Sequence, residues 1–278
     1  MKRITATIEV VRPHNMLAAA ACVCAGYYIA GGRDIRSIAY PVILTAFTVG
    51  FGNLINDYYD ADIDQVNKPR RPIPSGRLTQ QYVRTLYLLG SLVLTLCSFQ
   101  LVALRFAGII WIWELLLFLY AWKLKRMPLI GHVLVSMVAS SAFLGGAFVA
   151  GRLAAVAFPV FFAFMFVMGR ELVKGAEDVE GDKFVGANTL SVRLGVERTG
   201  GLAVFCMMIC VVAAPIPVLL TGYGLPYALV MELIVVPGLF VAAYQVLRNP
   251  AQTVLNRVSW IMKIEMFCGI VAMTLGSA

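Results

Sequence analysis

Long apolar segments separated by short polar ones run through almost the whole chain. A helix needs about 20 apolar residues to cross the hydrocarbon core of a bilayer, and the pattern provides nine segments of roughly that length. It therefore predicts an all-α, polytopic membrane protein with nine transmembrane helices and a single domain over residues 1–278. The predicted spans are 14–32, 37–56, 80–101, 106–122, 129–150, 153–173, 199–220, 225–247 and 256–276.

Composition supports this prediction because charged residues are scarce. They make up 14% of the chain, whereas a soluble domain has about 25%. When the nine segments are traced through a membrane, 19 of the 23 Lys and Arg residues fall on the side of the N-terminus. The positive-inside rule assigns that side, and the N-terminus, to the cytoplasm. The net charge of +8 fits anionic membrane lipids and anionic substrates, and basic residues scattered over short membrane loops argue against a nucleic-acid partner.

Acidic residues gather in two short stretches, residues 56–64 and 177–182. These stretches hold eight of the 15 Asp and Glu residues, and both fall on the predicted cytoplasmic side. Carboxylates close to a bilayer are costly, so an ionisable cluster there indicates a functional site. Two clusters on one face indicate a shared role.

The spacing within each cluster suits metal binding. If the helix over 37–56 continues past Asn56, then Asn56, Asp60 and Asp64 share one of its faces. Asp178 and Asp182 have the same four-residue spacing. Clustered oxygen ligands suit hard divalent cations, so the sequence predicts catalytic Mg²⁺ sites at these five residues. Two other acids of the first cluster are expected to point elsewhere, into a supporting layer or into solvent: Asp57 and Asp62.

Basic residues on the same predicted face are expected to bind phosphate. Lys68 and Arg71 belong to a segment stiffened by three prolines, and Lys125 lies in the loop between the fourth and fifth spans. Arginine offers a planar fork for phosphate, and lysine offers a point charge. Arg170 and Lys174, near the end of the sixth span, are expected to bind the same diphosphate or a second anionic substrate.

Metal sites beside a basic clamp suit the ionisation of an allylic diphosphate, because metal and cations stabilise the leaving diphosphate. Water would quench the carbocation that this step forms. A membrane cavity with apolar and aromatic walls excludes water and accepts a long isoprenoid tail. The predicted activity is therefore transfer of a polyprenyl group from its diphosphate to an acceptor.

The motifs also resemble those of a known family. Asn56-Asp57-x-x-Asp60-x-x-x-Asp64 and Asp178-x-x-x-Asp182 resemble the two Asp-rich motifs of the UbiA superfamily of intramembrane prenyltransferases. The resemblance covers essentially the whole chain. It implies nine helices around a central cavity in the cell membrane, with the active site facing the cytoplasm.

Finer features resemble the branch of this family that makes archaeal ether lipids. They lie in residues 12–15, 169–174 and 177–182. Enzymes of that branch transfer a geranylgeranyl group from its diphosphate to the free hydroxyl of geranylgeranylglyceryl phosphate. The resemblance implies this anionic lipid as the acceptor, which would suit Arg170 and Lys174, and it implies no obligate protein partner.

Three alternatives stay open at the level of sequence. The motifs alone also fit a prenyltransferase for an aromatic acceptor such as 4-hydroxybenzoate. A divalent-cation or anion transporter would also use acids as ion ligands, but transporters place such sites near the midplane and often contain repeats. Here the acids lie at one face, and the chain has no convincing repeat. The third alternative is a lipid-binding scaffold without catalytic activity.

Overall fold

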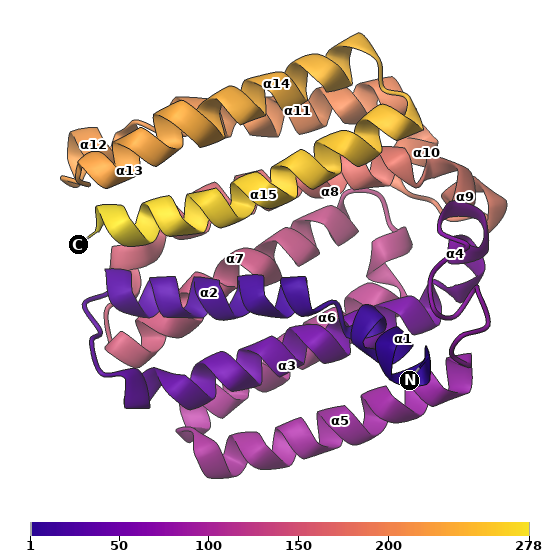
Figure 1. Ribbon diagram of the computed structural model, residues 1–278, viewed down its shortest axis with the longest axis horizontal. Coiled ribbons are helices and arrows are strands. Elements are labelled where there is room, and N and C mark those ends of the chain that lie inside the picture. The colour runs from indigo at the N-terminus through magenta and orange to yellow at the C-terminus, as the bar shows by residue number, and fades with distance from the viewer. Residues whose placement is uncertain (1, 278) are drawn as a thin grey trace.

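The computed structural model describes residues 2–277, which form helices joined by short connections (Figure 1). The described residues contain no strand, so the all-α prediction is confirmed. Eight helical segments in this part of the chain are long and apolar enough to cross a membrane. They are α3 (Ile35–Tyr59), α5 (Gln80–Leu101), α6 (Leu104–Trp122), α7 (Ile130–Ala150), η2 with α8 (Leu153–Glu177), α11 with α12 (Val196–Leu220), α13 with α14 (Leu225–Arg248) and α15 (Gln252–Gly276).

The remaining predicted span corresponds to α2 (Pro13–Ile29). Its 17 residues are at the lower end of what a membrane-crossing helix needs, so the count of nine spans and the cytoplasmic N-terminus remain predictions. Most predicted ends agree with the helices to within a few residues, and segment 80–101 coincides with α5. The prediction for the sixth span was too short, because α8 (Ala157–Glu177) continues to the start of the second acidic stretch.

Two predicted spans are interrupted by proline. Pro215 separates α11 (Val196–Ala213) from α12 (Ile216–Leu220). A π-helical turn, η3 (Met231–Val235), joins α13 (Leu225–Val230) to α14 (Val236–Arg248), where Pro237 lies in the first turn. Proline lacks an N–H and crowds the preceding turn, which favours a break or a local change of winding at these positions.

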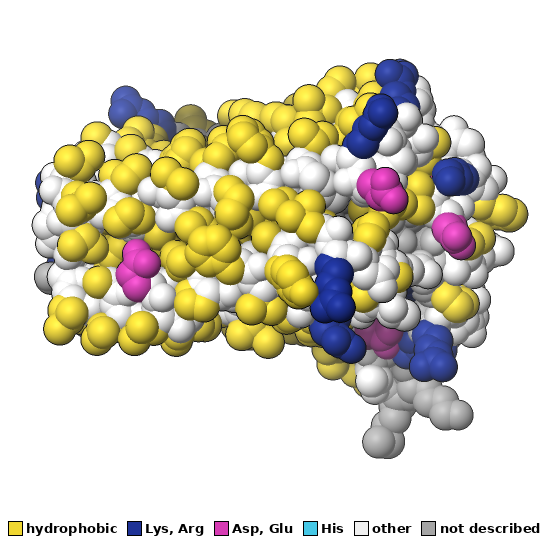
Figure 2. Space-filling model, turned by 90° about the horizontal axis from the view of Figure 1, so that it is seen from above, with side chains coloured by type: hydrophobic (Ala, Val, Ile, Leu, Met, Phe, Trp, Pro, Cys, Tyr) yellow, Lys and Arg dark blue, Asp and Glu magenta, His cyan; other side chains and the backbone are white. Residues whose placement is uncertain are grey.

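The outer surface of the bundle is apolar. Figure 2 shows hydrophobic side chains over most of one face, whereas most Lys, Arg, Asp and Glu side chains on that face lie toward one end. Large apolar side chains on α5 face outward, including Leu88, Leu92 and Leu96, which are 56–57% exposed. Such a surface suits contact with lipid chains.

Several short helices lie at one end of the bundle, opposite the end that carries α12 and α13 (Figure 1). This end carries α1 (Lys2–Val11), α4 (Ala61–Asn67), α9 (Val179–Phe184) and α10 (Leu190–Leu194). Helices α4 and α9 pack against each other, although they are far apart in sequence. Because α4 follows α3 and α9 follows α8, this contact brings the two acidic stretches together.

Around the centre of the bundle, α2 packs closely on α7. A Cβ added to Gly146 would lie 2.0 Å from the carbonyl oxygen of Val23, and one added to Gly26 would lie 2.1 Å from that of Phe143. Only glycine fits at either position, because the obstructing atoms belong to backbone. Small residues are the usual means of bringing membrane helices into such close contact.

We expect Gly146→Val to lower the midpoint of thermal unfolding in detergent by several degrees, because overpacking a helix contact costs about 1–3 kcal/mol. Gly201→Ala is the control, since Gly201 is an exposed residue of α11 and a Cβ there would meet nothing within 4 Å. Its midpoint should stay unchanged or rise slightly. Equal midpoints for Gly146→Val and the parent protein would contradict the close packing of α2 on α7.

Candidate active site

A cavity of about 640 Å³ lies inside the bundle. Side chains from α2, α3, α6, α7, α8 and α15 form its walls, and the short segments at the polar end complete it. All ten predicted site residues line this one cavity. They are Asn56, Asp60, Asp64, Lys68, Arg71, Lys125, Arg170, Lys174, Asp178 and Asp182.

The first acidic stretch does not continue as one straight helix. Helix α3 ends at Tyr59, and Asp60 forms the joint with α4, with φ −89° and ψ 0°. Hydrogen bonds between residues four apart nevertheless continue across the joint: the Asp60 N–H donates to Asn56 at 2.9 Å, and the Asp64 N–H donates to Asp60 at 2.8 Å. The four-residue spacing is thus kept, and the Asn56 side-chain amide donates to Asp60 Oδ2 at 2.8 Å.

The second stretch repeats this arrangement. Helix α8 ends at Glu177, and Asp178 forms the joint with α9, with φ −88° and ψ 4°. The Asp182 N–H donates to the Asp178 carbonyl at 3.1 Å. The Thr189 hydroxyl donates to Asp182 Oδ2 at 2.9 Å, a contact that no sequence pattern indicated.

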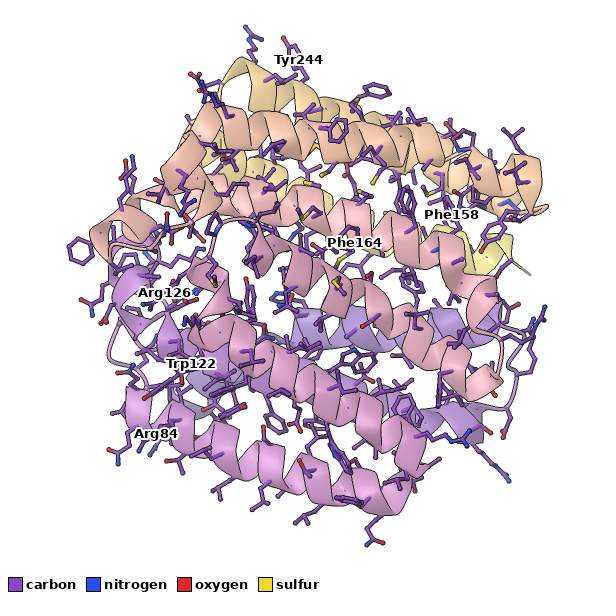
Figure 3. All side chains as sticks on the ribbon, turned by 180° about the vertical axis from the view of Figure 1, so that it is seen from behind. Arg84, Trp122, Arg126, Phe158, Phe164 and Tyr244 are labelled. Atoms are coloured by element: carbon purple, nitrogen blue, oxygen red, sulfur yellow. The ribbon has the colours of Figure 1, made fainter. Side chains whose placement is uncertain are left out.

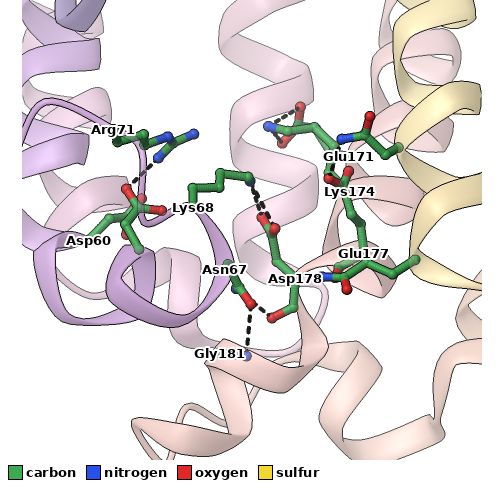
Figure 4. Close-up of polar contacts among 12 residues, drawn as sticks. Asp60, Asn67, Lys68, Arg71, Glu171, Lys174, Glu177, Asp178 and Gly181 are labelled. Atoms are coloured by element: carbon green, nitrogen blue, oxygen red, sulfur yellow. Dashed lines mark hydrogen bonds and ion pairs between the residues drawn. The ribbon is translucent and has the colours of Figure 1, made fainter. Parts of the chain in front are cut away.

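Two residues just after the first stretch, Asn67 and Lys68, make polar contacts with the second stretch (Figure 4). Lys68 Nζ lies 2.8 and 2.9 Å from the two carboxylate oxygens of Asp178. Asn67, the last residue of α4, donates to the Asp178 carbonyl at 2.9 Å and accepts from the Gly181 N–H at 3.0 Å. A Cβ on Gly181 would lie 2.4 Å from Asn67 Nδ2, so this contact also needs glycine.

Every carboxylate of the first stretch that lines the cavity is paired with a cation. Lys125 contacts Asp60, and Arg71 Nη1 lies 2.5 Å from Asp64. Asp57 contacts Arg12 and lies 3.5 Å from Arg71. The expectation that Asp57 points elsewhere was therefore wrong: it is 4% exposed and lines the cavity with the others.

Outside this network, Asp62 is exposed, as expected. Arg12 was singled out from sequence only as part of a resemblance, and its role as partner of Asp57 was missed. The one local feature of the sequence that could have indicated a site role for Arg12 is its position directly before the first apolar segment.

Burial and the paired cations act on these carboxylates in opposite directions. Burial works to raise the pKa of Asp60, but the charge and hydrogen bond of Lys125 outweigh it and hold that pKa below its usual value. Burial dominates at Asp64 and at Asp182, whose pKa values are raised. These carboxylates lie at the polar end of the cavity, which we call its mouth. Additional positive charge there would stabilise their ionised form.

The donor atoms fit a hard divalent cation. As the side chains stand, the described residues contain no group of three His, Cys, Asp or Glu side chains arranged to hold a metal, because lysine and arginine contact the carboxylates instead. The ligand set nevertheless consists of oxygen, which Mg²⁺ prefers. The Asn56 side-chain oxygen is buried and has no hydrogen-bond partner, so it is free to become a ligand.

Further inside, α8 presents a second group of charges. Arg170 Nη1 donates to Glu171 Oε1 at 3.0 Å, and Lys174 Nζ lies 3.3 Å from the same oxygen. Lys174 is one helical turn from Asp178, and Arg170 is two turns away. Lys174 and Arg170 are thus placed one after the other along α8, from the mouth of the cavity toward its interior.

The rest of the cavity is apolar. Phe162, Phe166 and Met273 contribute to its wall. Phe162 precedes Asp178 by 16 residues of α8, which corresponds to about 24 Å along a helix. In Figure 3, Trp122 and Arg126 lie at the polar end and Phe158 lies at the other. The site therefore joins a charged mouth to a long apolar interior.

Comparisons with known proteins agree with this geometry. Residues 19–267 match the model of the UbiA prenyltransferase family. A protein of Methanothermobacter thermautotrophicus named digeranylgeranylglyceryl phosphate synthase is 35% identical, over 97% of this chain and 95% of its own length. A protein of Methanopyrus kandleri with the same name is also 35% identical, over 96% of this chain and 97% of its own length.

Solved structures show the same fold. A structure described as that of a digeranylgeranylglyceryl phosphate synthase in membranes has a TM-score of 0.74 and 27% identity, and the match covers 100% of this chain and 99% of that one. A UbiA homologue from Archaeoglobus fulgidus, solved with DMAPP and Mg²⁺, has a TM-score of 0.69 and 16% identity. The match covers 97% of this chain and 99% of the homologue. With its family model matched over most of its length and relatives of 35% identity over nearly all of it, this chain belongs to the UbiA prenyltransferase family and is a multi-pass membrane enzyme.

Proposed function

We propose that the protein transfers a geranylgeranyl group from its diphosphate to the hydroxyl of geranylgeranylglyceryl phosphate, a step of archaeal-type ether lipid synthesis. The observation that carries this proposal is the convergence of two acidic motifs and a set of cations on the mouth of one apolar cavity. The names of the relatives support the choice of donor and acceptor.

The diphosphate of the donor would bind at the charged mouth. Lys68, Arg71 and Lys125 contact carboxylates there, so they are held where a diphosphate could take over as their partner. They come from two different loops and would surround the leaving group from more than one side. Charge-assisted hydrogen bonds from such cations are among the stronger polar contacts in proteins.

Mg²⁺ is the cofactor that the donor atoms suit. Asn56, Asp60 and Asp64 would hold one ion, and Asp178 and Asp182 another. When bound, the metal would neutralise charge on the diphosphate and help it to leave. The Archaeoglobus fulgidus homologue, which has the same fold, was solved with DMAPP and Mg²⁺. This observation supports Mg²⁺ as the cofactor.

The apolar interior would hold the prenyl chain. Its walls exclude water, which would otherwise capture the allylic cation. Aromatic side chains among them, such as Trp113 and Tyr120, offer ring faces that attract a cation. Arg170 and Lys174 would bind the diphosphate or the phosphate of the acceptor, and the released diphosphate or an acidic residue would take the hydroxyl proton.

The setting of the reaction follows from the bundle. The proposed site opens at the polar end, which the distribution of basic residues assigns to the cytoplasmic face of the cell membrane. The partners we propose are a polyprenyl diphosphate, a lipid acceptor and the surrounding membrane lipids. No nucleic acid and no obligate protein partner are part of the proposal.

The rival functions are less well supported. Relatives named for ether lipid synthesis match nearly the whole chain at 35% identity, which favours a lipid acceptor over 4-hydroxybenzoate. A divalent-cation transporter would need its acidic groups along a conduction path, whereas these acids lie at one end of a cavity lined by apolar side chains.

We expect Asp60→Ala and Asp182→Ala each to lower prenyl transfer at least about a hundredfold, because each removes a group that stabilises charge on the leaving diphosphate. Transfer is measured with labelled geranylgeranyl diphosphate, the glyceryl phosphate lipid and Mg²⁺ in detergent. Asp62→Ala is the matched control, since Asp62 belongs to the same stretch but is exposed, and it should keep near-parental activity. Near-parental activity in both Asp60→Ala and Asp182→Ala would refute the metal assignment.

The acceptor can be identified from the mass of the product. Incubation of the protein with geranylgeranyl diphosphate and one acceptor at a time should give digeranylgeranylglyceryl phosphate, and no prenylated 4-hydroxybenzoate. The reverse result would refute the acceptor that we propose. Flux of Mg²⁺ into liposomes without any prenyl substrate would instead support a transporter.

A further inference from the structure

A second group of basic side chains also lines the cavity, and one of them, Arg12, pairs with Asp57 of the first acidic stretch. Arg12 and His14 stand at the start of α2, Arg170 is on α8, and Lys263 is on α15. Helix α15 packs against both α2 and α8, so three elements far apart in sequence bring these side chains to one place. We call these four residues the inner basic cluster.

The charges of this cluster act on one another. The positive charges of Arg12 and Arg170 both reach Lys263 and His14. Arg12 is neutralised by Asp57, and Glu171 is shared between Arg170 and Lys174. The cations of the cluster therefore outnumber the carboxylates that pair with them. His14 is exposed and Lys263 is half-buried, and unpaired charge within a membrane-spanning bundle is costly.

Lys263 is the cation of the cluster that has no carboxylate partner. It lies in the middle of the 25-residue helix α15, and within residues 2–277 no ion pair involves it. Its ammonium lies 4.5 Å from the centre of the Trp260 ring. Glu265, two residues further along α15, also lines the cavity, but its buried carboxylate oxygens lie against Gly238 of α14 without a hydrogen-bond partner, and no ion pair joins it to Lys263 within the described residues.

Arg170 also has unused donor capacity. Its Nη1 donates to Glu171 at 3.0 Å, but its Nε is buried and has no hydrogen-bond partner. A guanidinium can bind a carboxylate and a phosphate at the same time through different N–H groups. An anion between Arg170 and Lys263 would satisfy the Nε and balance the excess charge.

Two members of the inner basic cluster, Arg170 and Lys263, lie deeper in the cavity than the proposed diphosphate clamp of Lys68, Arg71 and Lys125. Arg170 precedes Asp178 by eight residues of helix, about 12 Å along its axis. On α15, Asn256 donates to Glu177 at the polar end, and Lys263 lies seven residues further in, about 10 Å along the helix. Lys174 lies between the two regions and is closer to the clamp.

We propose that Lys263 and Arg170 bind the phosphate of the acceptor lipid, with His14 beside them, and that Lys174 serves the diphosphate. This inference rests on the proposed function and assigns a separate site to each of the two anionic groups. In a glyceryl phosphate the reacting hydroxyl is only a few atoms from the phosphate. Anchoring the phosphate two turns from the motifs would direct the hydroxyl toward the donor and select acceptors that carry a phosphate.

Lys263→Met tests the assignment in the full chain in detergent. We expect the KM for geranylgeranylglyceryl phosphate to rise about 10- to 100-fold, the usual range for loss of a hydrogen bond to a charged group. The KM for geranylgeranyl diphosphate should stay within about twofold of the parent value, and Lys263→Arg should restore most of the loss. Arg257→Met is the matched control, because Arg257 is an exposed cation of the same helix outside the cavity.

An acceptor without phosphate separates binding of the anion from general damage to the fold. The parent protein and Lys263→Met should use geranylgeranylglycerol equally poorly, whereas only the parent should prefer the phosphorylated lipid. Unchanged KM values for both substrates in Lys263→Met would overturn the inference and leave the proposed function intact. A parent protein that makes no product from the phosphorylated acceptor would contradict the proposed function instead.

Binding without donor tests the cluster independently of turnover. Geranylgeranylglyceryl phosphate should raise the thermal unfolding midpoint of the parent protein but not that of Lys263→Met. Phosphatidylglycerol serves as the comparison, since it offers a phosphate of a bulk membrane lipid. Equal stabilisation of the parent by both lipids, lost together in Lys263→Met, would show a general phospholipid site and overturn the assignment to the acceptor. Stabilisation by the acceptor that persists in Lys263→Met would also overturn it.

Discussion

The site depends on the pairing of buried and half-buried carboxylates with cations that come from other parts of the chain. Asp60 contacts Lys125, Asp64 contacts Arg71, and Asp178 contacts Lys68. An unpaired charge in such a place would cost several kcal/mol. Each pair therefore both permits the acid to be buried and ties a motif to a loop.

The same pairing suits the mouth of the cavity to the substrates that we propose. A diphosphate brings negative charge for the cations, and a divalent ion brings positive charge for the carboxylates. Substrate and metal could thus replace the internal pairs without leaving either set of side chains unbalanced. Under the proposed function, this exchange would keep a site rich in both signs of charge balanced before and after binding.

Both motifs use the same local geometry to reach the cavity. Each begins at the last turn of a long membrane helix, passes through an aspartate with φ near −90° and ψ near 0°, and continues in a short helix. Residues four apart stay hydrogen-bonded across the joint, so the ligand spacing survives while the chain changes direction. The contact of Asn67 with Asp178 and Gly181 then holds the two short helices together.

The sequence alone determined the membrane class, the positions of most spans and the ten candidate residues that share one cavity. These follow from hydropathy and from four-residue spacing, which are local properties of the chain. Only the tertiary structure decided that the helices bend at Asp60 and Asp178, that Arg12 pairs with Asp57, and that Lys263 and Arg170 line the same cavity. Those relations depend on which helices pack together, and a lone charge within an apolar segment carries no signal of its neighbours until packing brings them into contact.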